Sequence, residues 1–192
     1  MGKKDKIERA WKKIRKREKR ENNEENSGKK KKAKGYNGVV ITSIIDPPKL
    51  RLHTTKGDKN NPRSVFSKED RYEQLKKTIE SVREKVPDSY IILVECSELT
   101  SEQLKYLSEK CNRVMNLYGD SKKKELIYSP YKSIGDITQT IFGFSVIKDI
   151  DTKKKSIFFK SISKISGRYW LNEKFDEKKI YDNEKIIVKG SG

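Results

Sequence analysis

The sequence predicts an α/β fold in which a mostly parallel sheet is flanked by helices, as in Rossmann-like proteins. Short β-branched, nearly all-apolar runs occur at residues 39–45 (VVITSII) and 90–94 (YIILV). Such runs are typical of strands that are buried on both faces. Segments of helical periodicity separate the runs, and strands that alternate with helices imply a parallel sheet with right-handed crossovers.

The first strand, residues 39–45, ends at Asp46-Pro47-Pro48, because proline cannot donate a hydrogen bond to a strand ladder. A long polar loop follows over residues 49–66, and loops of this length in a compact domain are often functional.

Two capping boxes predict where the next helices begin. Ser67 with Asp70 opens a helix, and Thr100 with Gln103 opens another, which leads into a short strand at 114–117. The residues expected to face inward from these two helices are Tyr72, Leu75, Ile79, Val82 and Val86, and then Leu104, Leu107 and Cys111.

The second half of the chain continues the alternation. Residues 119–132 are rich in turn formers, with a short edge strand expected at Glu125–Tyr128. A third helix begins at Ser133 or Asp136, and along one face it carries Ile137, Ile141, Phe144 and then Ile147 or Lys148. It leads to a fourth strand in SIFFKSISKISGRYWL (156–171), and a further strand is expected at 180–188. Phe142, Phe144, Phe158 and Phe159 are expected in the core. Because the chain stops soon after the last strand, we expect a C-terminally truncated domain.

The positive charge is concentrated at the N-terminus. Residues 1–35 hold 16 Lys and Arg against 6 Asp and Glu, so they carry +10 of the net charge of +18. We expect a partly helical, otherwise disordered arm over 1–35 and a domain over 36–192. The arm either contacts polyanions such as nucleic acid or an anionic surface, without specificity, or serves as a solubilising or targeting extension. No apolar run is long enough for a transmembrane helix, and a cytoplasmic location is expected.

The rare residue types exclude several kinds of site. Cys96 and Cys111 are isolated, which favours two buried thiols over a disulfide or a zinc site. The only histidine, His53, lies in the polar loop, which argues against a Ser-His-Asp triad.

The carboxyl ends of the strands are where an open α/β sheet binds ligands. That rule selects Thr42 to Asp46, Glu95 to Ser97 and Ser163 to Tyr169. Glu95 is placed to accept hydrogen bonds from a ribose or a base. Lys132, Lys164 and Arg168 could neutralise a diphosphate. The glycine-rich motifs GxGxxG and GxxxxGK[ST] are absent. Asp149-Ile150-Asp151 has the spacing of a metal-binding D-x-D, but we expect a solvated turn there.

Four blocks in this order resemble a known family: RYEQLKKTIESV (71–82), YIILVECS (90–97), KSIGDITQTIFGF (132–144) and FFKSISKISGRYWL (158–171). Together they are similar to the N-terminal, nucleotide-sugar half of GT-A glycosyltransferases, especially divergent members from bacteria and large DNA viruses. The resemblance covers about residues 36–189. The matching positions are Arg71, Gln74, Thr78 and Ile79, then Lys132, Gly135 and Asp136, and then Lys164 to Tyr169.

The resemblance implies transfer of a sugar from a nucleotide-diphosphate donor to a glycan or protein acceptor that the sequence does not identify. The substrate-binding residues expected from position and resemblance together are Thr42, Ser43, Arg71, Glu95, Lys132, Asp136, Lys164, Ser166 and Arg168.

The sequence departs from the family at its metal site. GT-A enzymes usually end the fourth strand in D-x-D, which holds Mn²⁺ or Mg²⁺, whereas this chain has S-G-R-Y. We therefore assign no metal ligand and no catalytic residue. Either basic side chains take the place of the metal, or this domain has lost or changed its chemistry, and Mn²⁺ or Mg²⁺ stays open as a cofactor. Whether this chain is an active transferase stays open. The alternative function is a non-enzymatic basic α/β module whose N-terminal arm binds nucleic acid or an anionic surface.

Overall fold

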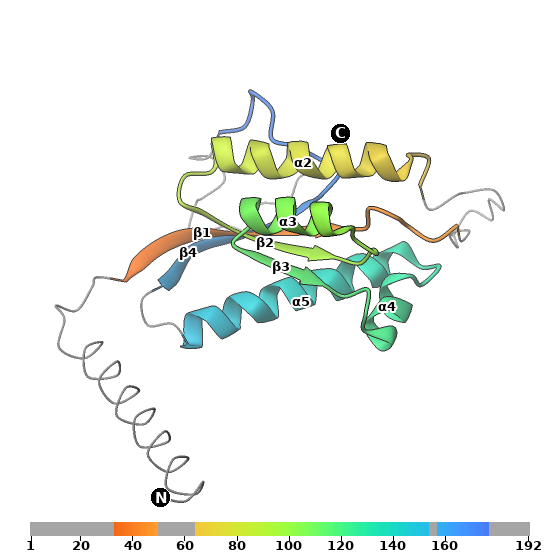
Figure 1. Cartoon of the computed structure of the whole chain (residues 1–192). Helices are drawn as coiled ribbons and strands as arrows, with labels where there is room; N and C mark the ends of the chain where they lie inside the picture. The colour runs from red at the N-terminus through yellow and green to blue at the C-terminus, as the bar shows by residue number, and fades with distance from the viewer. Residues whose placement is uncertain (1–32, 50–63, 154–156, 177–192) are drawn as a thin grey trace, which may run out of the picture. The chain divides into compact units, whose positions relative to one another are not determined.

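The computed structural model describes residues 33–49, 64–153 and 157–176. Over these residues the chain is an α/β fold with a parallel sheet in the strand order β3-β2-β1-β4. Figure 1 shows α2 and α3 on one face of the sheet and α5 on the other, with α4 beside it. The predicted α/β class is therefore confirmed. The strands are β1 (Lys34–Ser43), β2 (Ser89–Glu95), β3 (Arg113–Asn116) and β4 (Ile157–Ser166), and the helices are α2 (Lys68–Lys85), α3 (Ser101–Lys110), α4 (Ser121–Ile127) and α5 (Lys132–Lys153).

The two central strands bury alternate residues in two separate cores. From β1, Val39 and Ile41 pack toward α2 and α3, whereas Val40 packs toward α5. In β2, Ile91 and Leu93 likewise belong to the first core and Ile92 and Val94 to the second. Helices cover both faces, so both sets must be apolar, which explains the continuous apolar runs in the sequence.

Both predicted capping boxes are present. The Ser67 hydroxyl accepts from Asp70 N at 3.0 Å, and Ser67 N donates to the Asp70 carboxylate at 3.2 Å. Thr100 and Gln103 exchange the same pair of bonds at the start of α3. The inward residues of α2 are buried as predicted, with Tyr72 partly so. Leu104 in α3 is the exception, with 44% of its surface exposed, because the outer strand beneath this short helix has only four residues.

Strand β1 begins at Lys34, five residues before the predicted start and inside the predicted arm. The segment Lys34–Gly38 did not resemble a strand because glycine and asparagine are poor strand formers. Its glycines are needed where β4 pairs with β1. A Cβ atom on Gly35 would lie 2.6 Å from Phe158 Cζ and from Lys160 Cε. Packing against β4 therefore overrides strand propensity here.

The expected edge strand at Glu125–Tyr128 is wrong, because these residues belong to α4 and its C-terminal cap. Asp120 caps this helix, and its side chain accepts from Lys123 N at 3.1 Å. Ile127 turns inward and is fully buried in the core beneath α5. A short capped helix of seven residues therefore buries the apolar residue that the sequence had assigned to a strand.

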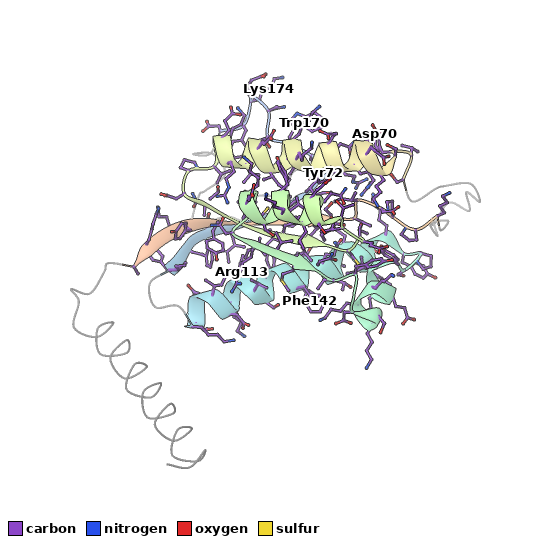
Figure 2. All side chains as sticks on the ribbon, viewed as in Figure 1. Asp70, Tyr72, Arg113, Phe142, Trp170 and Lys174 are labelled. Atoms are coloured by element: carbon purple, nitrogen blue, oxygen red, sulfur yellow. The ribbon has the colours of Figure 1, made fainter. Side chains whose placement is uncertain are left out.

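The face of α5 that packs on the sheet is the opposite of the one its large apolar residues indicate. Figure 2 labels Phe142, which packs partly buried against the sheet, as does Phe159 of β4. The residues of α5 that are buried are Gly135, Gln139, Gly143, Ile147 and Ile150. The large residues Ile134, Ile137, Ile141 and Phe144, which we call the outer stripe, are exposed by 40%, 58%, 61% and 42%.

Close packing explains this reversal. A Cβ atom on Gly143 would lie 2.3 Å from Cγ1 of Val40, a fully buried residue of β1. The helix axis therefore lies so near the strand that no larger side chain fits between them. Phe158, expected in the core, is also exposed, by 44%, because β4 is the outermost strand of the described sheet.

The strand order reverses between β1 and β4. From β1 the chain crosses through α2 on one face to reach β2, and it arrives at β4 through α5 on the other face. This reversal of strand order is a topological switch point, and ligands of open α/β sheets bind outside the carboxyl ends of the strands at such a point. Predictions for the arm, for His53 and for a strand at 180–188 concern residues outside the described ranges.

Candidate functional site

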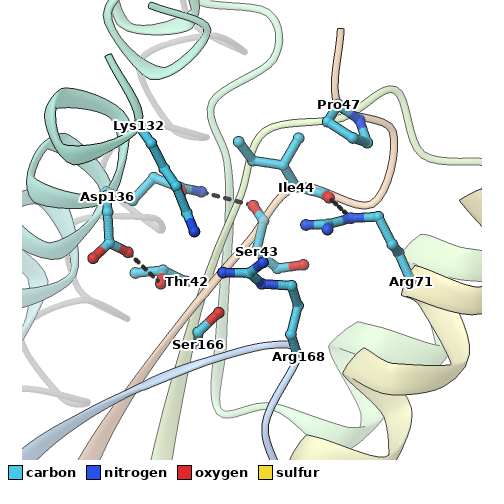
Figure 3. A pocket seen from close by; sticks show the side chains of 10 residues that line it. Thr42, Ser43, Ile44, Pro47, Arg71, Lys132, Asp136, Ser166 and Arg168 are labelled. Carbon is cyan, nitrogen blue, oxygen red and sulfur yellow. Dashed lines mark hydrogen bonds between the residues drawn. The ribbon is translucent and has the colours of Figure 1, made fainter. Parts of the chain in front are cut away.

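A pocket opens at this switch point and holds about 480 Å³ of space, part of it open to solvent. Figure 3 shows side chains that point into it from the ends of β1 and β4, from α2 and from α5. Most of the predicted site residues meet here, although they come from segments more than 120 residues apart. The lining residues are Thr42, Ser43, Ile44, Pro47, Arg71, Lys132, Asp136, Gln139, Ser166 and Arg168.

Three cationic side chains reach the pocket from three different elements. Arg71, in the first turn of α2, is 8% exposed and donates from Nε to the carbonyl oxygen of Ile44 at 2.6 Å. Lys132 is the first residue of α5, and Arg168 follows β4. Figure 3 shows the Lys132 and Arg168 side chains extending from opposite sides toward the space above Thr42 and Ser43. In the described ranges no carboxylate pairs with Arg168, so its charge is available to an anionic ligand.

Asp136 is the acidic residue that lines the pocket. Lys164 Nζ lies 2.8 Å from both of its carboxylate oxygens, and the Thr42 hydroxyl donates to one of them at 3.3 Å. Lys164 does not line the pocket itself, so its predicted role in direct contact is replaced by a role in holding Asp136. Lys164 therefore balances the charge of this carboxylate.

The turn after β4 is held against β1 by its glycine. Gly167 N donates to the carbonyl oxygen of Thr42 at 2.9 Å. A Cβ atom on Gly167 would lie 2.9 Å from Leu75 Cδ1 and 3.1 Å from Ser43 Cβ. The absence of a side chain therefore lets Ser166 and Arg168 stand directly beside the end of β1.

Gln139 and Pro47 line the pocket but were not among the predicted site residues. The Gln139 side chain, 3% exposed, donates to the carbonyl oxygens of Ser43 at 2.7 Å and Val94 at 3.0 Å, so it ties the ends of β1 and β2 to α5. The spacing of Gly135, Gln139 and Gly143, four residues apart, was the available indication. Two glycines on one face of a helix mark a close approach, and a polar side chain between them must bond to what it approaches.

Glu95 does not reach the pocket, which corrects its predicted role. It is fully buried, and its Oε1 accepts from Ile45 N at 3.0 Å and from Cys96 N at 3.1 Å. These bonds satisfy backbone groups where β1 leaves the sheet, so the carboxyl is not available to a ribose or a base. Burial raises the pKa of Glu95, and hydrogen bonding from the Ser97 hydroxyl and the neighbouring backbone N–H groups only partly offsets this. Oε2 has no well-formed hydrogen bond within the described residues.

Glu95→Gln should therefore make the stability of the domain less dependent on pH. With a raised pKa in the folded state, the folded protein keeps a proton that the unfolded chain loses above its ordinary pKa, so stability falls as pH rises through that window. Glutamine keeps the accepting oxygen and carries no charge. Urea unfolding from about pH 4 to 8 measures the free energy of unfolding of both proteins. The free energy of unfolding of the variant should rise relative to that of the parent protein as pH rises, and the two values should differ least at pH 4. A constant difference across this range would contradict the raised pKa.

The side chains at the pocket do not fit Mn²⁺ or Mg²⁺. Such ions are usually held by one or two carboxylates together with substrate phosphates, but Asp136, the single carboxylate in the described lining, is already paired with Lys164. Within residues 33–49, 64–153 and 157–176 no three His, Cys, Asp or Glu side chains are grouped closely enough to hold a metal. Asp149 and Asp151 lie in the last turns of α5 rather than in a turn, and Asp149 pairs with Lys153 at 3.3 Å.

Both cysteines are buried free thiols, as predicted. Burial raises the pKa of Cys111 to about 12, which makes the thiol unreactive at neutral pH.

No helix in the described part of the chain has the length and apolar character needed to span a bilayer. No protein-family model, no curated protein and no solved structure matches the chain.

Proposed function

We propose that the domain binds a nucleotide-diphosphate sugar at the switch-point pocket, for glycosyl transfer. The observation that carries the proposal is the pocket at the carboxyl ends of β1 and β4, with Arg71, Lys132 and Arg168 in its lining. Asp136, the one carboxylate in the described lining, is paired with Lys164. A lining with three basic side chains favours an anionic ligand, such as a diphosphate.

Each lining group has a task in this proposal. Arg168 presents a planar fork of N–H donors that matches two phosphate oxygens, whereas Lys132 supplies a compact charge. The hydroxyl of Ser166 can donate to one of the remaining oxygens, whereas the hydroxyl of Ser43 already bonds to Glu95. Because these donors stabilise the diphosphate as it gains charge, they would help it to leave from the sugar without a metal ion.

Asp136 is suited to the uncharged part of the ligand. Its carboxylate accepts hydrogen bonds, and Lys164 and Thr42 fix its position. Sugar and ribose hydroxyls are donors of the kind that such a carboxylate binds. The choice of a nucleotide and a sugar, rather than another diphosphate ester, depends on the resemblance to GT-A glycosyltransferases.

Thermal unfolding with a ligand panel tests this function. We expect UDP- or GDP-sugars to raise the melting temperature by about 5–10 °C at about 100 times the dissociation constant, because such binding stabilises the fold by about 2.7 kcal/mol. CMP-sugars and inorganic pyrophosphate complete the panel. The shift should be the same with Mn²⁺ or with EDTA, since the lining lacks metal ligands. If pyrophosphate shifts the melting temperature as far as every nucleotide sugar does, the pocket is an anion site and the nucleotide-sugar proposal is wrong.

The alternative function makes a different prediction about the same chain. If the domain serves only to carry a nucleic-acid-binding arm, no nucleotide sugar shifts the melting temperature. DNA binding is then strongly salt-dependent, because Lys and Arg release counterions from phosphates. Replacing Lys29–Lys32 with glutamine would weaken it.

A further inference from the structure

We infer that the outer stripe of α5 is a homodimer interface, on which a second copy of the chain packs its own α5 in the antiparallel direction. The four residues of the stripe are all large and apolar, and their exposed fractions are between 40% and 61%. They follow one another at spacings of three, four and three residues, which is the spacing of a helix–helix seam. Exposed apolar stripes of this kind mark interaction sites in soluble proteins.

The surroundings of the stripe are suited to a dry interface. From Ser133 to Ile147 the only charged residue is Asp136, in a chain with 39% charged residues, and Asp136 is held by Lys164 toward the pocket. The hydroxyls beside the stripe bond within their own helix: Thr138 to Ile134 O at 2.7 Å, Thr140 to Asp136 O at 2.7 Å and Ser145 to Phe142 O at 2.8 Å. These hydroxyls therefore need neither water nor a polar partner for their protons.

The pattern of the helix identifies the partner as a second copy. The segment 133–145, SIGDITQTIFGFS, has nearly the same pattern when read in either direction about Gln139. A two-fold axis at the level of Gln139 would therefore bring apolar residues against apolar residues and hydroxyls against hydroxyls, as an isologous dimer requires. The matched positions are Ile137 with Ile141, Ile134 with Phe144, Thr138 with Thr140, Ser133 with Ser145 and Gly135 with Gly143.

Charge sets the conditions under which the dimer forms. Each copy carries a net charge of +18, so two copies repel one another, and the uncharged face of α5 is where they approach at least cost. Salt screens this repulsion without weakening apolar contacts. The stripe is small compared with the interfaces of permanent dimers, so we expect a reversible dimer at protein concentrations above about 10 µM.

Sedimentation equilibrium of the full chain tests the inference. We expect a monomer–dimer equilibrium that strengthens as NaCl rises from about 0.05 to 0.5 M. Ile137→Glu with Ile141→Glu should abolish the dimer and leave the melting temperature of the monomer unchanged, because both residues are exposed. Leu104→Glu is the matched control. It also places a charge at an exposed apolar position of a helix, but on the opposite face of the sheet, and should leave the dimer intact.

Disulfide trapping tests the direction of the pairing. An antiparallel pair brings Ile134→Cys of one copy against Phe144→Cys of the other, but separates residue 134 of the two copies by about 15 Å along the helix. A mixture of the two variants should form a heterodimer that Ile134→Cys alone does not form. The buried Cys96 and Cys111 do not compete.

Three results would overturn the inference. They are a monomer at every concentration, a dimer that survives the double glutamate variant, and cross-linking of Ile134→Cys with itself, which requires a parallel pair. A chain that stays monomeric but binds anionic vesicles through the same two isoleucines would assign the stripe to a membrane surface instead.

Discussion

Gly143→Ala should lower the free energy of unfolding by about 2 kcal/mol, although alanine is the better helix former by about 1 kcal/mol. The new methyl group would lie 2.3 Å from Cγ1 of Val40, so helix and strand must separate or Val40 must move. Val40 is fully buried and β-branched, so it has little freedom to yield. Urea unfolding measures the loss, and Gly143→Leu should prevent folding altogether.

Two further variants separate this clash from a general effect of replacing glycine. Gly119→Ala should change stability little, because no atom lies within 4 Å of its added Cβ. Val40→Ala removes the two methyl carbons that lie nearest to the new Cβ atom of Gly143→Ala, so the double variant should be more stable than the sum of the two single losses predicts. If the losses in the free energy of unfolding of the two single variants simply add in the double variant, α5 does not pack on β1 through this contact.

Arg168→Ala should weaken binding of the nucleotide-diphosphate sugar by about 10- to 100-fold, the effect of losing hydrogen bonds between charged partners. The folded domain should lose little stability, because Arg168 is only partly buried and the ring it faces, that of Tyr169, is 61% exposed. Titration calorimetry measures the affinity, and urea unfolding of the same variant measures the stability.

Lys148→Ala is the control for charge alone. It removes one positive charge from an exposed position of α5 outside the pocket, so the net charge of the chain falls by the same amount while the pocket is untouched. Arg168→Lys should recover only part of the affinity, since lysine lacks the planar fork. If Arg168→Ala and Lys148→Ala weaken the affinity for the ligand equally, Arg168 does not contact the ligand. An unfolded Arg168→Ala would mean that the turn after β4 is structural.

Local sequence patterns predicted those helices and strands that neighbouring residues determine. The apolar runs of β1 and β2 and the two capping boxes depend on neighbouring residues and on burial from both faces, and all are present. The face of α5 was not predictable in this way, because the largest apolar residues normally mark the buried side. Here the distance between α5 and β1 admits only glycine at position 143, and that distance is a property of the whole sheet.

The pocket was predictable to the extent that it depends on topology. Once the strands were known to be parallel, the ends of β1 and β4 had to lie at one edge, and the basic residues after β4 and at the start of α5 had to lie near it. The role of Glu95 was not predictable, because an acidic residue at a strand end is equally suited to a ligand and to the backbone beyond it. Burial decided between them, through the N–H groups of Ile45 and Cys96.

The pairing of β4 with β1 has a consequence for regulation. Asn37 and Ser161 bond across it at 2.8 Å, although 124 residues separate them in the chain, and the two sides of the pocket lie at the far end of the same pair of strands. A molecule bound in the pocket as proposed would touch both strands, so its free energy of binding would add to the attachment of β4, the outermost strand of the described sheet. Occupancy of the pocket and the integrity of this sheet edge would then be thermodynamically linked, and detachment of β4 would release the ligand.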